Sequence, residues 1–502
     1  MAAGAGVTPR MSTTRPVRFF HRGSIVEVDT AQPTRTVLEW LREDARCTGT
    51  KEGCAEGDCG ACTVVLGSLD AKSDLQLKPV NACIQFLPTL DGQALFTVED
   101  LAAMNPVSGT LHPVQQALVD CHGSQCGFCT PGFVMSLFAC YEKHQSAGTQ
   151  PSRQALADDL SGNLCRCTGY RPILDAGQQM FAQPAVRLHT EPVVQALRGL
   201  QADTPLSTSS GFHAPRSLAE FATLRLAKPQ ARILAGSTDM GLWVTKQFRE
   251  LGELISINAV DELKRVQAGS SHITIGAAAS LEDAWAALAS EWPSLRDVWL
   301  RFASLPIRRA GTMGGNVANG SPIGDSAPVL IALGATLVLQ KGTVQRRMPL
   351  EDFYVDYMKN RLEPGEFVHS LEVPRAKATQ RVQAYKISKR FDCDISAVCA
   401  ALVVELQGDT VSDARLAFGG MAGIVKRAAK AEEALVGQPW TETTLKAAQA
   451  AMSTDFAPLT DMRASAAYRI QVAQNLLRRF WLQTRPQGPL AESVVSVFAR
   501  EA

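Results

Sequence analysis

The sequence predicts a multidomain protein of the α+β class. Its 502 residues correspond to about three domains at ~150 residues each, enough to bury sizeable hydrophobic cores. The hydrophobic pattern changes along the chain: strands around one helix in residues 17–98, helices in 100–182, and mixed strands and helices from 216 onward. Cysteine usage changes with it, since 11 of the 13 cysteines precede residue 168.

The first region is expected to be a small sheet crossed by one helix. Residues 17–30 alternate around a Gly-Ser turn, which predicts a hairpin. Residues 61–67 and 94–98 are expected to be two further strands, and residues 35–43 have the spacing of a helix with one apolar face.

The second region is expected to be helical, and a linker rich in proline and serine should follow it at about 183–215. An antiparallel sheet is expected after residue 380. The other strands of the third region are expected at 231–236, 253–257, 272–277 and 335–340, and its helices at 281–289, 325–333, about 443–452 and about 463–482.

Composition narrows the class of function. Lys and Arg number 50 and Asp and Glu 49, so the net charge of +1 gives no reason to expect nucleic acid or an anionic membrane as a partner. No apolar run reaches the ~20 residues of a membrane span, and the first residues lack the apolar core of a signal peptide. We therefore expect a cytoplasmic protein, with a flexible tail of about ten residues and Met11 as an alternative start.

One set of cysteines has the spacing of a plant-type [2Fe-2S] site. Cys54, Cys59 and Cys62 follow the pattern C-x4-C-x2-C, and Cys83 comes after twenty intervening residues. The intervening glycines suit a loop that must curl so that three thiolates converge on two irons. Zinc is the alternative, but zinc sites usually contain two C-x2-4-C pairs, whereas this set has three cysteines and then one.

A second set combines Cys126-x2-Cys129 with Cys165-x-Cys167. A helix is expected after Cys129 with Pro131 in its first turn, and Pro172 should open another after the second pair. Free N–H groups at helix starts favour an anionic cluster. Spacing alone leaves both zinc and iron–sulfur open at this site, because four cysteines suit either.

The other five cysteines are expected to be small buried hydrophobic side chains without a ligand role. They are Cys47, Cys121, Cys140, Cys393 and Cys399.

Two glycine-rich motifs follow in the third region. One is the strand and turn Leu234-Ala235-Gly236-Ser237-Thr238-Asp239, and the other is Gly311-Thr312-Met313-Gly314-Gly315-Asn316, followed at a short distance by Asp325. Both place small residues and hydroxyl groups where backbone N–H groups could face a pyrophosphate. Taken singly, each motif is also compatible with an ordinary turn.

Together these motifs resemble the molybdenum hydroxylase family. GCAEGDCGACTV, SQCGFCTPG, SGNLCRCTGYRPI, LAGSTD and TMGGN with its later Asp occur in the order found in the chain that carries the iron–sulfur and FAD domains of bacterial xanthine dehydrogenases. The resemblance covers roughly residues 16–490 and implies that both cysteine sets bind [2Fe-2S] clusters. It implies a β-grasp ferredoxin domain at 16–100, a helical-bundle [2Fe-2S] domain at 101–183, a linker at 184–212, a two-part α+β FAD-binding domain at 213–378 and a C-terminal α+β flavoprotein domain at 379–490.

The resemblance also implies which residues contact FAD. The stretch from Arg232 through Ile233, Leu234, Ala235, Gly236, Ser237, Thr238 and Asp239 to Met240 would wrap the cofactor, with N–H groups of Gly236 to Asp239 near its diphosphate. The further contacts would be Phe302, Thr312, Gly314, Gly315, Asn316, Asp325, Val368 and Lys386. Cys393 would lie in the loop from Lys386 to Asp394 beside the isoalloxazine, Tyr357 near an NAD site, and Gln125 between the second cluster and a molybdenum cofactor.

By this resemblance, substrate is oxidised at a molybdenum cofactor on a separate large subunit, in an assembly of two small and two large chains. Electrons would then reach the second cluster, the first cluster, FAD and finally NAD⁺, with a purine as substrate. We expect no catalytic side chain on this chain, because the cofactors perform the redox chemistry.

Three alternatives stay open from the sequence. The chain could serve a related hydroxylase acting on aldehydes or on aromatic compounds. It could be a zinc-stabilised scaffold without catalysis, although that would not explain the glycine motifs. It could also be a stand-alone NADH-dependent reductase that delivers electrons to another acceptor.

Overall fold

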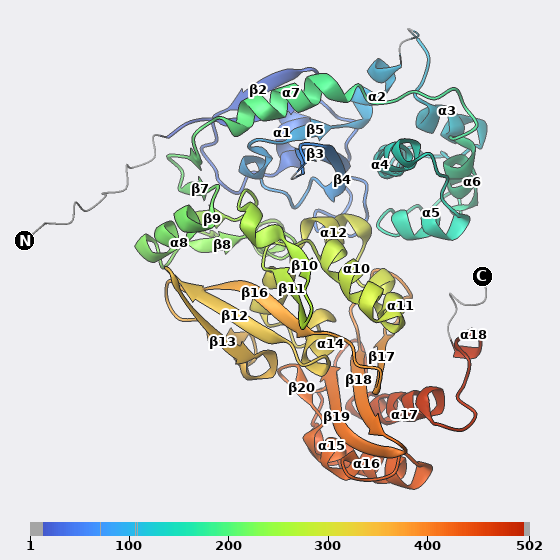
Figure 1. The fold of residues 1–502 in the computed structure, drawn as a ribbon. Helices are drawn as coiled ribbons and strands as arrows, with labels where there is room; N and C mark the ends of the chain where they lie inside the picture. Colours follow the sequence, from blue (N-terminus) through green and yellow to red (C-terminus); the bar gives the residue numbers. More distant parts are fainter. Residues whose placement is uncertain (1–13, 71, 106, 108, 496–502) are drawn as a thin grey trace, which may run out of the picture. The chain divides into compact units, whose positions relative to one another are not determined.

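The computed structural model describes residues 14–70, 72–105, 107 and 109–495, so the expected tail and Met11 lie outside the described residues. The chain forms two compact units. Unit 1 comprises the chain up to Ala157, Asn163–Phe221 and Gln230–Ala259, and unit 2 comprises Asp158–Gly162, Ala222–Pro229 and the chain from Val260 onward. Figure 1 labels their elements.

Unit 1 begins with a five-stranded sheet in the order β2-β1-β5-β3-β4, in which β1 and β5 are parallel and the other pairs antiparallel. Its strands are β1 (Val17–His21), β2 (Ser24–Val28), β3 (Thr63–Leu69), β4 (Leu75–Asn81) and β5 (Ala94–Phe96). Helix α1 (Val37–Glu43) begins at a capping box made by Thr36 and Glu39. The expected hairpin, helix and strands are confirmed, and β4 is an additional edge strand.

A group of helices follows the sheet (Figure 1). They are α2 (Val98–Met104), α3 (Pro113–Asp120), α4 (Thr130–Ala147), α5 (Arg153–Asp159), α6 (Arg171–Gln179) and α7 (Thr190–Gln201), and the 3-10 turn η1 (Leu87–Leu90) precedes them. Helix α4 is buried from Gly132 to Glu142, so it forms the centre of this region. The range that was expected to be a linker contains the 12-residue helix α7.

The last part of unit 1 is a small sheet in the order β6-β7-β9-β8, in which β9 is parallel to both β7 and β8. Its elements are β6 (Leu206–Ser207), β7 (Phe212–Ala214), β8 (Arg232–Leu234), α9 (Met240–Thr245) and β9 (Leu254–Ser256). Helix α8 (Leu218–Ala227) crosses from unit 1 to unit 2.

Unit 2 contains a five-stranded antiparallel sheet in the order β10-β11-β16-β12-β13. Its strands are β10 (Val266–Ala268), β11 (His272–Gly276), β12 (Thr336–Lys341), β13 (Val344–Pro349) and β16 (Phe367–Pro374). Its helices are α10 (Leu281–Glu291), α11 (Arg296–Arg301), α12 (Leu305–Ala310), α13 (Met313–Asn319) and α14 (Ser326–Ala332), with 3-10 turns η2 (Asp261–Lys264), η3 (Pro293–Leu295) and η4 (Leu350–Asp352) and the hairpin β14 (Tyr354–Asp356) and β15 (Lys359–Asn360).

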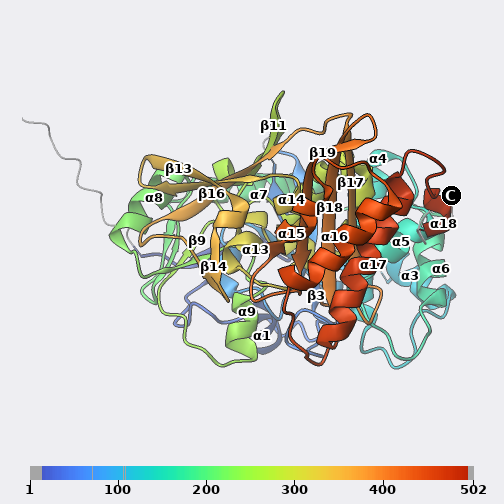
Figure 2. The same cartoon turned by 90° about the horizontal axis from the view of Figure 1, so that it is seen from below.

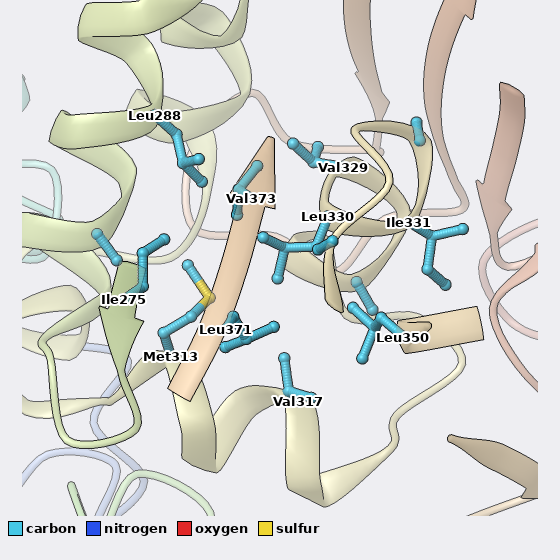
Figure 3. Close-up of a cluster of buried hydrophobic side chains, with 14 of the residues drawn as sticks. Ile275, Leu288, Met313, Val317, Val329, Leu330, Ile331, Leu350, Leu371 and Val373 are labelled. Carbon is cyan, nitrogen blue, oxygen red and sulfur yellow. The ribbon is translucent and has the colours of Figure 1, made fainter. Parts of the chain in front are cut away.

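The core of this part of unit 2 joins sheet and helices. Figure 3 shows Leu371 and Val373 of the central strand β16 among Met313 and Val317 of α13 and Leu330 of α14. All five side chains are fully buried. Helix α13, which carries the second glycine-rich motif, is therefore anchored by its apolar face.

The C-terminal part of unit 2 is an antiparallel sheet in the order β17-β18-β19-β20. Helices α15, α16 and α17 lie together over it (Figure 2). The elements are β17 (Gln380–Ile387), β18 (Val398–Gln407), β19 (Thr410–Gly419), β20 (Lys426–Arg427), α15 (Ala429–Leu435), α16 (Glu442–Asp455), α17 (Ala466–Thr484) and α18 (Glu492–Val495). The expected sheet after residue 380 and the two expected helices are confirmed. In the described ranges, no helix combines the length and the hydropathy that crossing a bilayer requires.

Candidate functional site

The structure brings the first cysteine set together. Cys54, Cys59 and Cys62 lie on the loop between α1 and β3, and Cys83 follows the end of β4. The Cys54 thiol contacts those of Cys59 and Cys83, and the Cys62 thiol also contacts Cys83. Cys62 and Cys83 are only 1% and 2% exposed, so the protein encloses this side of the group.

Hydrogen bonds in this set favour a charged sulfur. Contacts with the thiols of Cys59 and Cys83 hold the pKa of Cys54 far below its usual value, and the Cys59 N–H also donates to Cys54 Sγ at 3.3 Å. The same contacts raise the pKa values of Cys59 and Cys83, because a thiol that donates to a charged sulfur holds its proton more tightly. A metal cluster that takes thiolate ligands would replace these protons.

The loop reaches this shape through left-handed backbone. Gly57 and Gly60 have φ of 78° and 71°, and Ala55 has φ of 53°. A Cβ atom on Gly53 would lie 2.8 Å from Cys59 Sγ, so a side chain there would press on a ligand.

The second cysteine set lies at two helix starts and is more open. Cys129 directly precedes α4, and the Cys165/Cys167 pair precedes α6, as the sequence predicted. Thiol contacts join Cys129 to Cys165 and Cys126 to Cys167. Cys126 and Cys167 are exposed, whereas burial raises the pKa of Cys129 to about 12.

Thr168 supports this second set. Its backbone N–H and its hydroxyl both approach Cys165 Sγ, at 3.5 and 3.3 Å, and they help to lower the pKa of that thiol. The Cys165 N–H in turn donates to Tyr170 Oη at 3.1 Å. The loop therefore presents hydrogen-bond donors to a sulfur that carries negative charge.

The two cysteine loops are in direct contact within unit 1. The Leu164 N–H donates to the Cys59 carbonyl oxygen at 3.0 Å, so a ligand-bearing residue of the first loop is bonded to the residue before Cys165. Gly132 of α4 packs so closely on this loop that a Cβ atom would lie 2.1 Å from the Gly60 oxygen.

A buried polar network closes the same junction. Asn163, 2% exposed, donates through Nδ2 to the Gly60 oxygen at 3.1 Å and to Thr63 Oγ1 at 3.2 Å. Ser136 of α4 donates to Asn163 Oδ1 at 2.6 Å. Sequence reasoning missed these residues, because their function depends on a contact across 103 positions of the chain.

The donor chemistry of both sets fits iron–sulfur clusters. Each set offers four thiols, joined by contacts through Cys54 and Cys83 in the first set and as two contacting pairs in the second. N–H or O–H groups donate to a sulfur in both sets, as iron–sulfur clusters favour. Over the ranges that the structure describes, no group of three or more His, Cys, Asp or Glu side chains has the arrangement of a single-ion site.

The first glycine-rich motif forms a tight turn between β8 and α9 in unit 1. Ser237 has φ of 62°, and its buried hydroxyl has no hydrogen-bond partner among the described residues. Within the same described ranges, the N–H groups of Ser237 and Thr238 donate to no protein acceptor. Unpaired donors at a turn of this kind fit an anionic oxygen such as that of a diphosphate.

This turn packs against the first cysteine loop, inside the same unit. Gln85, two residues after Cys83, donates through Nε2 to the Gly236 oxygen at 3.1 Å. Thr245 of α9 donates to the Ala55 oxygen at 2.7 Å. The first glycine-rich turn and the helix α9 that follows it are therefore bonded to the two segments that carry the first cysteine set.

The second glycine-rich motif forms the start of α13 in unit 2. Thr312 caps the helix, because its hydroxyl accepts the Gly315 N–H at 3.1 Å. The Gly314 N–H donates to the Ala277 oxygen, and a Cβ atom there would lie 2.6 Å from that oxygen. The N–H groups of Gly314 and Gly315 are engaged inside the protein, so they do not supply the expected donors to a pyrophosphate. At these two positions a ligand would meet a backbone surface without a Cβ atom, and the Asn316 side chain would add a polar group.

Phe302 is held beside this motif by a buried arginine. Arg308, 2% exposed, forms an ion pair with Glu282 at 2.6 Å and donates to the carbonyl oxygens of Phe302 and Ala303, both at 3.1 Å. The Phe302 ring packs at 6.0 Å from that of Trp285. Arg308 therefore holds the backbone of Phe302, the aromatic residue expected to face the cofactor, and Trp285 packs against its ring.

Asp325 and Lys386 form a buried ion pair. Lys386 Nζ lies 2.6 Å from Asp325 Oδ2 and donates to Ser396 Oγ at 2.8 Å, and the Ser396 hydroxyl donates to Asp325 Oδ1 at 2.6 Å. All three side chains are at most 3% exposed. Ser396 was not expected from the sequence, because nothing in the chain around it marks it as polar and buried.

The remaining expected residues lie apart from these groups. Val368 is buried in β16, Tyr357 is 62% exposed near the hairpin of β14 and β15, and Gln125 is exposed next to Cys126. Cys393 has φ of 51° and donates to the Ser161 oxygen at 3.2 Å. Of the cysteines expected to be buried, Cys47, Cys140 and Cys399 are, whereas Cys121 and Cys393 are half-buried.

Comparisons with known proteins match this arrangement domain by domain. Four family models match the chain: the 2Fe-2S iron–sulfur cluster binding domain at 19–87, the [2Fe-2S] binding domain at 97–178, the FAD binding domain in molybdopterin dehydrogenase at 207–376, and the CO dehydrogenase flavoprotein C-terminal domain at 383–484. The two cysteine sets fall inside the two iron–sulfur models, and both glycine-rich motifs fall inside the third.

The chain belongs to the molybdenum hydroxylase family. It contains two [2Fe-2S] domains and an FAD-binding domain, and it is an iron–sulfur and flavin electron-transfer chain of that family. The choice between zinc and iron that spacing left open at the second set is thereby decided for iron–sulfur.

Similar proteins and solved structures are consistent with this family assignment. The chain is 32% identical to xanthine dehydrogenase of Emericella nidulans over 88% of its length, and 30% identical to aldehyde oxidase 4 of Cavia porcellus over 87%. It spans only 36% and 37% of those two relatives. It also resembles a carbon monoxide dehydrogenase chain from Hydrogenophaga pseudoflava, with 28% identity and a TM-score of 0.51 over 55% of this chain and 96% of the other.

Proposed function

We propose that this chain is the electron-transfer subunit of an NAD⁺-dependent xanthine dehydrogenase. In this proposal a separate large subunit carries the molybdenum cofactor and oxidises hypoxanthine and xanthine to urate. The similarity to xanthine dehydrogenases over most of this chain supports the substrate. A molybdopterin-bearing partner is supported by the family, and we propose an assembly of two small and two large subunits.

One observation carries the proposal: three sites lie in sequence within unit 1. The second cysteine loop is bonded to the first through Leu164 and Cys59, and the first is bonded to the flavin turn through Gln85 and Thr245. A chain of bonded sites is what electron transfer over a long distance needs, and it serves no purpose in a zinc scaffold.

Residues of this chain would bind the two clusters and FAD. Cys54, Cys59, Cys62 and Cys83 would bind one cluster, and Cys126, Cys129, Cys165 and Cys167 the other. The turn from Arg232 to Met240 would hold FAD together with Phe302, Thr312, Gly314, Gly315, Asn316, Asp325, Val368 and Lys386. When bound, the clusters would carry electrons one at a time, and a flavin would collect two electrons and a proton that can leave together as a hydride.

Residues that are not ligands hold the cysteine loops and the proposed flavin contacts in position. Asn163 and Ser136 fix the junction of the two loops. Arg308 fixes Phe302, and Asp325 with Ser396 fixes the ammonium group of Lys386. NAD⁺ is proposed to approach near Tyr357, whose exposed ring is free to stack on a planar ligand.

An aldehyde-oxidising enzyme is the second candidate. The relatives include aldehyde oxidases at 30% identity, close to the value for the xanthine dehydrogenases. The substrate pocket would lie on the large subunit in either case, so this chain does not discriminate between them.

Co-purification with the large subunit tests the proposal. We expect the complex to contain molybdenum and to reduce NAD⁺ with xanthine, and the isolated chain to oxidise NADH with an artificial acceptor but to leave xanthine unchanged. Activity on aldehydes without activity on xanthine would favour the second candidate. Xanthine oxidation by the isolated chain would contradict the division of sites between two subunits.

A further inference from the structure

Asn81 is a buried amide beside the first cysteine set. It is the last residue of β4, paired in register with Thr63 of β3, and its side chain is 1% exposed. Neither Nδ2 nor Oδ1 has a hydrogen-bond partner of normal geometry among the described residues. The backbone places the amide beside Cys62: Asn81 is the register partner of Thr63, the residue after Cys62, and the N–H of Ala82 donates to the Cys62 carbonyl oxygen at 3.1 Å. The amide side chain is also in reach of the Cys62 sulfur.

An unpaired buried amide is costly. Removing such a group from water without a new hydrogen bond destabilises a protein by about 1–3 kcal/mol. The backbone here does not require an asparagine, because its carbonyl oxygen accepts the Ile84 N–H at 3.2 Å whatever the side chain. A leucine of similar volume would avoid this loss of stability, which suggests that the amide has a role other than stabilising the fold.

A sulfur ligand supplies that reason. Cys62 lies beside the amide, Cys83 is two residues away in the chain, and both are nearly fully buried. Thiolates bound to iron are strong acceptors and have little water around them at this site. The amide Nδ2–H is thus placed to donate to a sulfur that becomes charged when it binds metal.

We propose that Asn81 is a positioning residue that donates a hydrogen bond to the Cys62 sulfur and thereby raises the reduction potential of the first cluster above that of the same cluster without the bond. The proposal rests on the assignment of Cys54, Cys59, Cys62 and Cys83 as ligands. The direction follows from charge: the reduced cluster carries one more negative charge, so a donor to sulfur stabilises it more than the oxidised cluster.

Replacement by leucine tests the proposal. In Asn81→Leu, we expect the ratio of reduced to oxidised first cluster at a fixed potential to fall about tenfold, which is 59 mV for a one-electron couple. The measurement is a redox titration of the purified chain followed by electron paramagnetic resonance. The second cluster is the internal reference, and its potential should not change.

Thr89→Val is the matched control. Thr89 is 5% exposed in the same domain, and its hydroxyl donates to the Phe86 oxygen rather than to a sulfur. This variant should leave both potentials unchanged. An unchanged first-cluster potential in a fully loaded Asn81→Leu protein, with equal or higher thermal stability, would overturn the proposal, since the amide would then be merely an unpaired group.

A second measurement needs no variant. The wild-type chain is labelled with asparagine that carries ¹⁵N only in the side-chain amide, and pulsed electron paramagnetic resonance is recorded on the reduced first cluster. We expect a ¹⁵N coupling, and its absence would overturn the proposal even if Asn81→Leu failed to fold. A wild-type chain without a [2Fe-2S] signal would instead contradict the ligand assignment, so the two failures are distinguishable.

Discussion

The two cysteine sets bind clusters of the same kind in opposite surroundings. In the first, Cys62 and Cys83 are buried at the ends of paired strands. In the second, Cys126 and Cys167 are exposed on loops that precede helices. The reduction potential of the first cluster should therefore depend mainly on buried protein groups such as Asn81. That of the second should depend on the helix N-termini, on Thr168 and on the solvent or protein in contact with it.

The largest effect should come from the residue that joins the two sites. Gly132→Val should destabilise unit 1 by about 3 kcal/mol or more and should lower the iron content at both sites, because the new side chain would collide with the Gly60 carbonyl group. Thermal unfolding and iron analysis measure this. Gly199→Ala in α7 is the control, since nothing lies within 4 Å of its Cβ position. Equal stability of Gly132→Val and wild type would refute the close contact.

Removing one ligand should separate the sites. Cys165→Ala should lose the second cluster and keep the first, so the iron content should fall from roughly four to roughly two atoms per chain, because each set of four thiolates holds two irons. Electron paramagnetic resonance identifies the remaining signal. The reciprocal variant Cys62→Ala should lose the first signal. Loss of both signals in a folded, flavin-loaded Cys165→Ala protein would contradict independent binding.

Acid should affect the helical region that carries the second site. Burial among Phe138 and Tyr141 lowers the pKa of His112 to about 4 from its ordinary value near 6.5. The folded state binds fewer protons than the unfolded state in this window, so stability falls as the pH drops from 6.5 to 4, by about 3 kcal/mol in total. Urea unfolding at pH 7 and pH 4.5 measures it. His112→Asn, which retains a helix-capping side chain, should lose less stability on acidification; an identical loss would rule out His112 as the cause.

The smallest effect is expected at the polar network between the loops. Ser136→Ala removes the donor to Asn163 Oδ1, so the free energy of unfolding should fall by about 1 kcal/mol. Ser146→Ala on the same helix, where the hydroxyl accepts from an exposed Arg187, should change it by less than ~0.5 kcal/mol. If the two variants proved equally stable, the network would not hold the junction.

The sequence predicted those parts of the sites whose structure depends on residues that are close together in the chain. Cysteine spacing and Pro131 predicted the ligand sets and the helix after Cys129, because a loop and a helix start depend on neighbours in the chain. Strand β4 was not expected, since Pro79 weakens a strand pattern; it is tolerated because β4 lies at the edge of the sheet. Prolines likewise predict a linker where helix α7 forms, although Pro192 lies in the first turn of this helix, where proline is tolerated.

Long-range features could not be predicted in this way. The Asn163–Gly60 bond, the Gly132 contact and the engagement of the Gly314 N–H by Ala277 depend on where distant segments meet. Gly314 of the second motif illustrates the ambiguity: glycine permits a close approach, and its N–H group meets the carbonyl oxygen of Ala277.

The few hydrogen bonds between the flavin turn and the first cysteine loop have a consequence for how the protein must be built. The bonds from Gln85 and Thr245, with the exposed ion pair of Lys246 and Glu56, would by themselves give only weak association between separate proteins. Because α7 and the short strands after it connect the two segments in one chain, the effective concentration of one for the other is on the order of millimolar. After cleavage of the backbone between Ala202 and Pro205, noncovalent bonds alone would join the two segments, among them those from Arg216 to the oxygens of Leu200 and Gln201. A connection that is permanent in the intact chain would then depend on protein concentration whenever those bonds open.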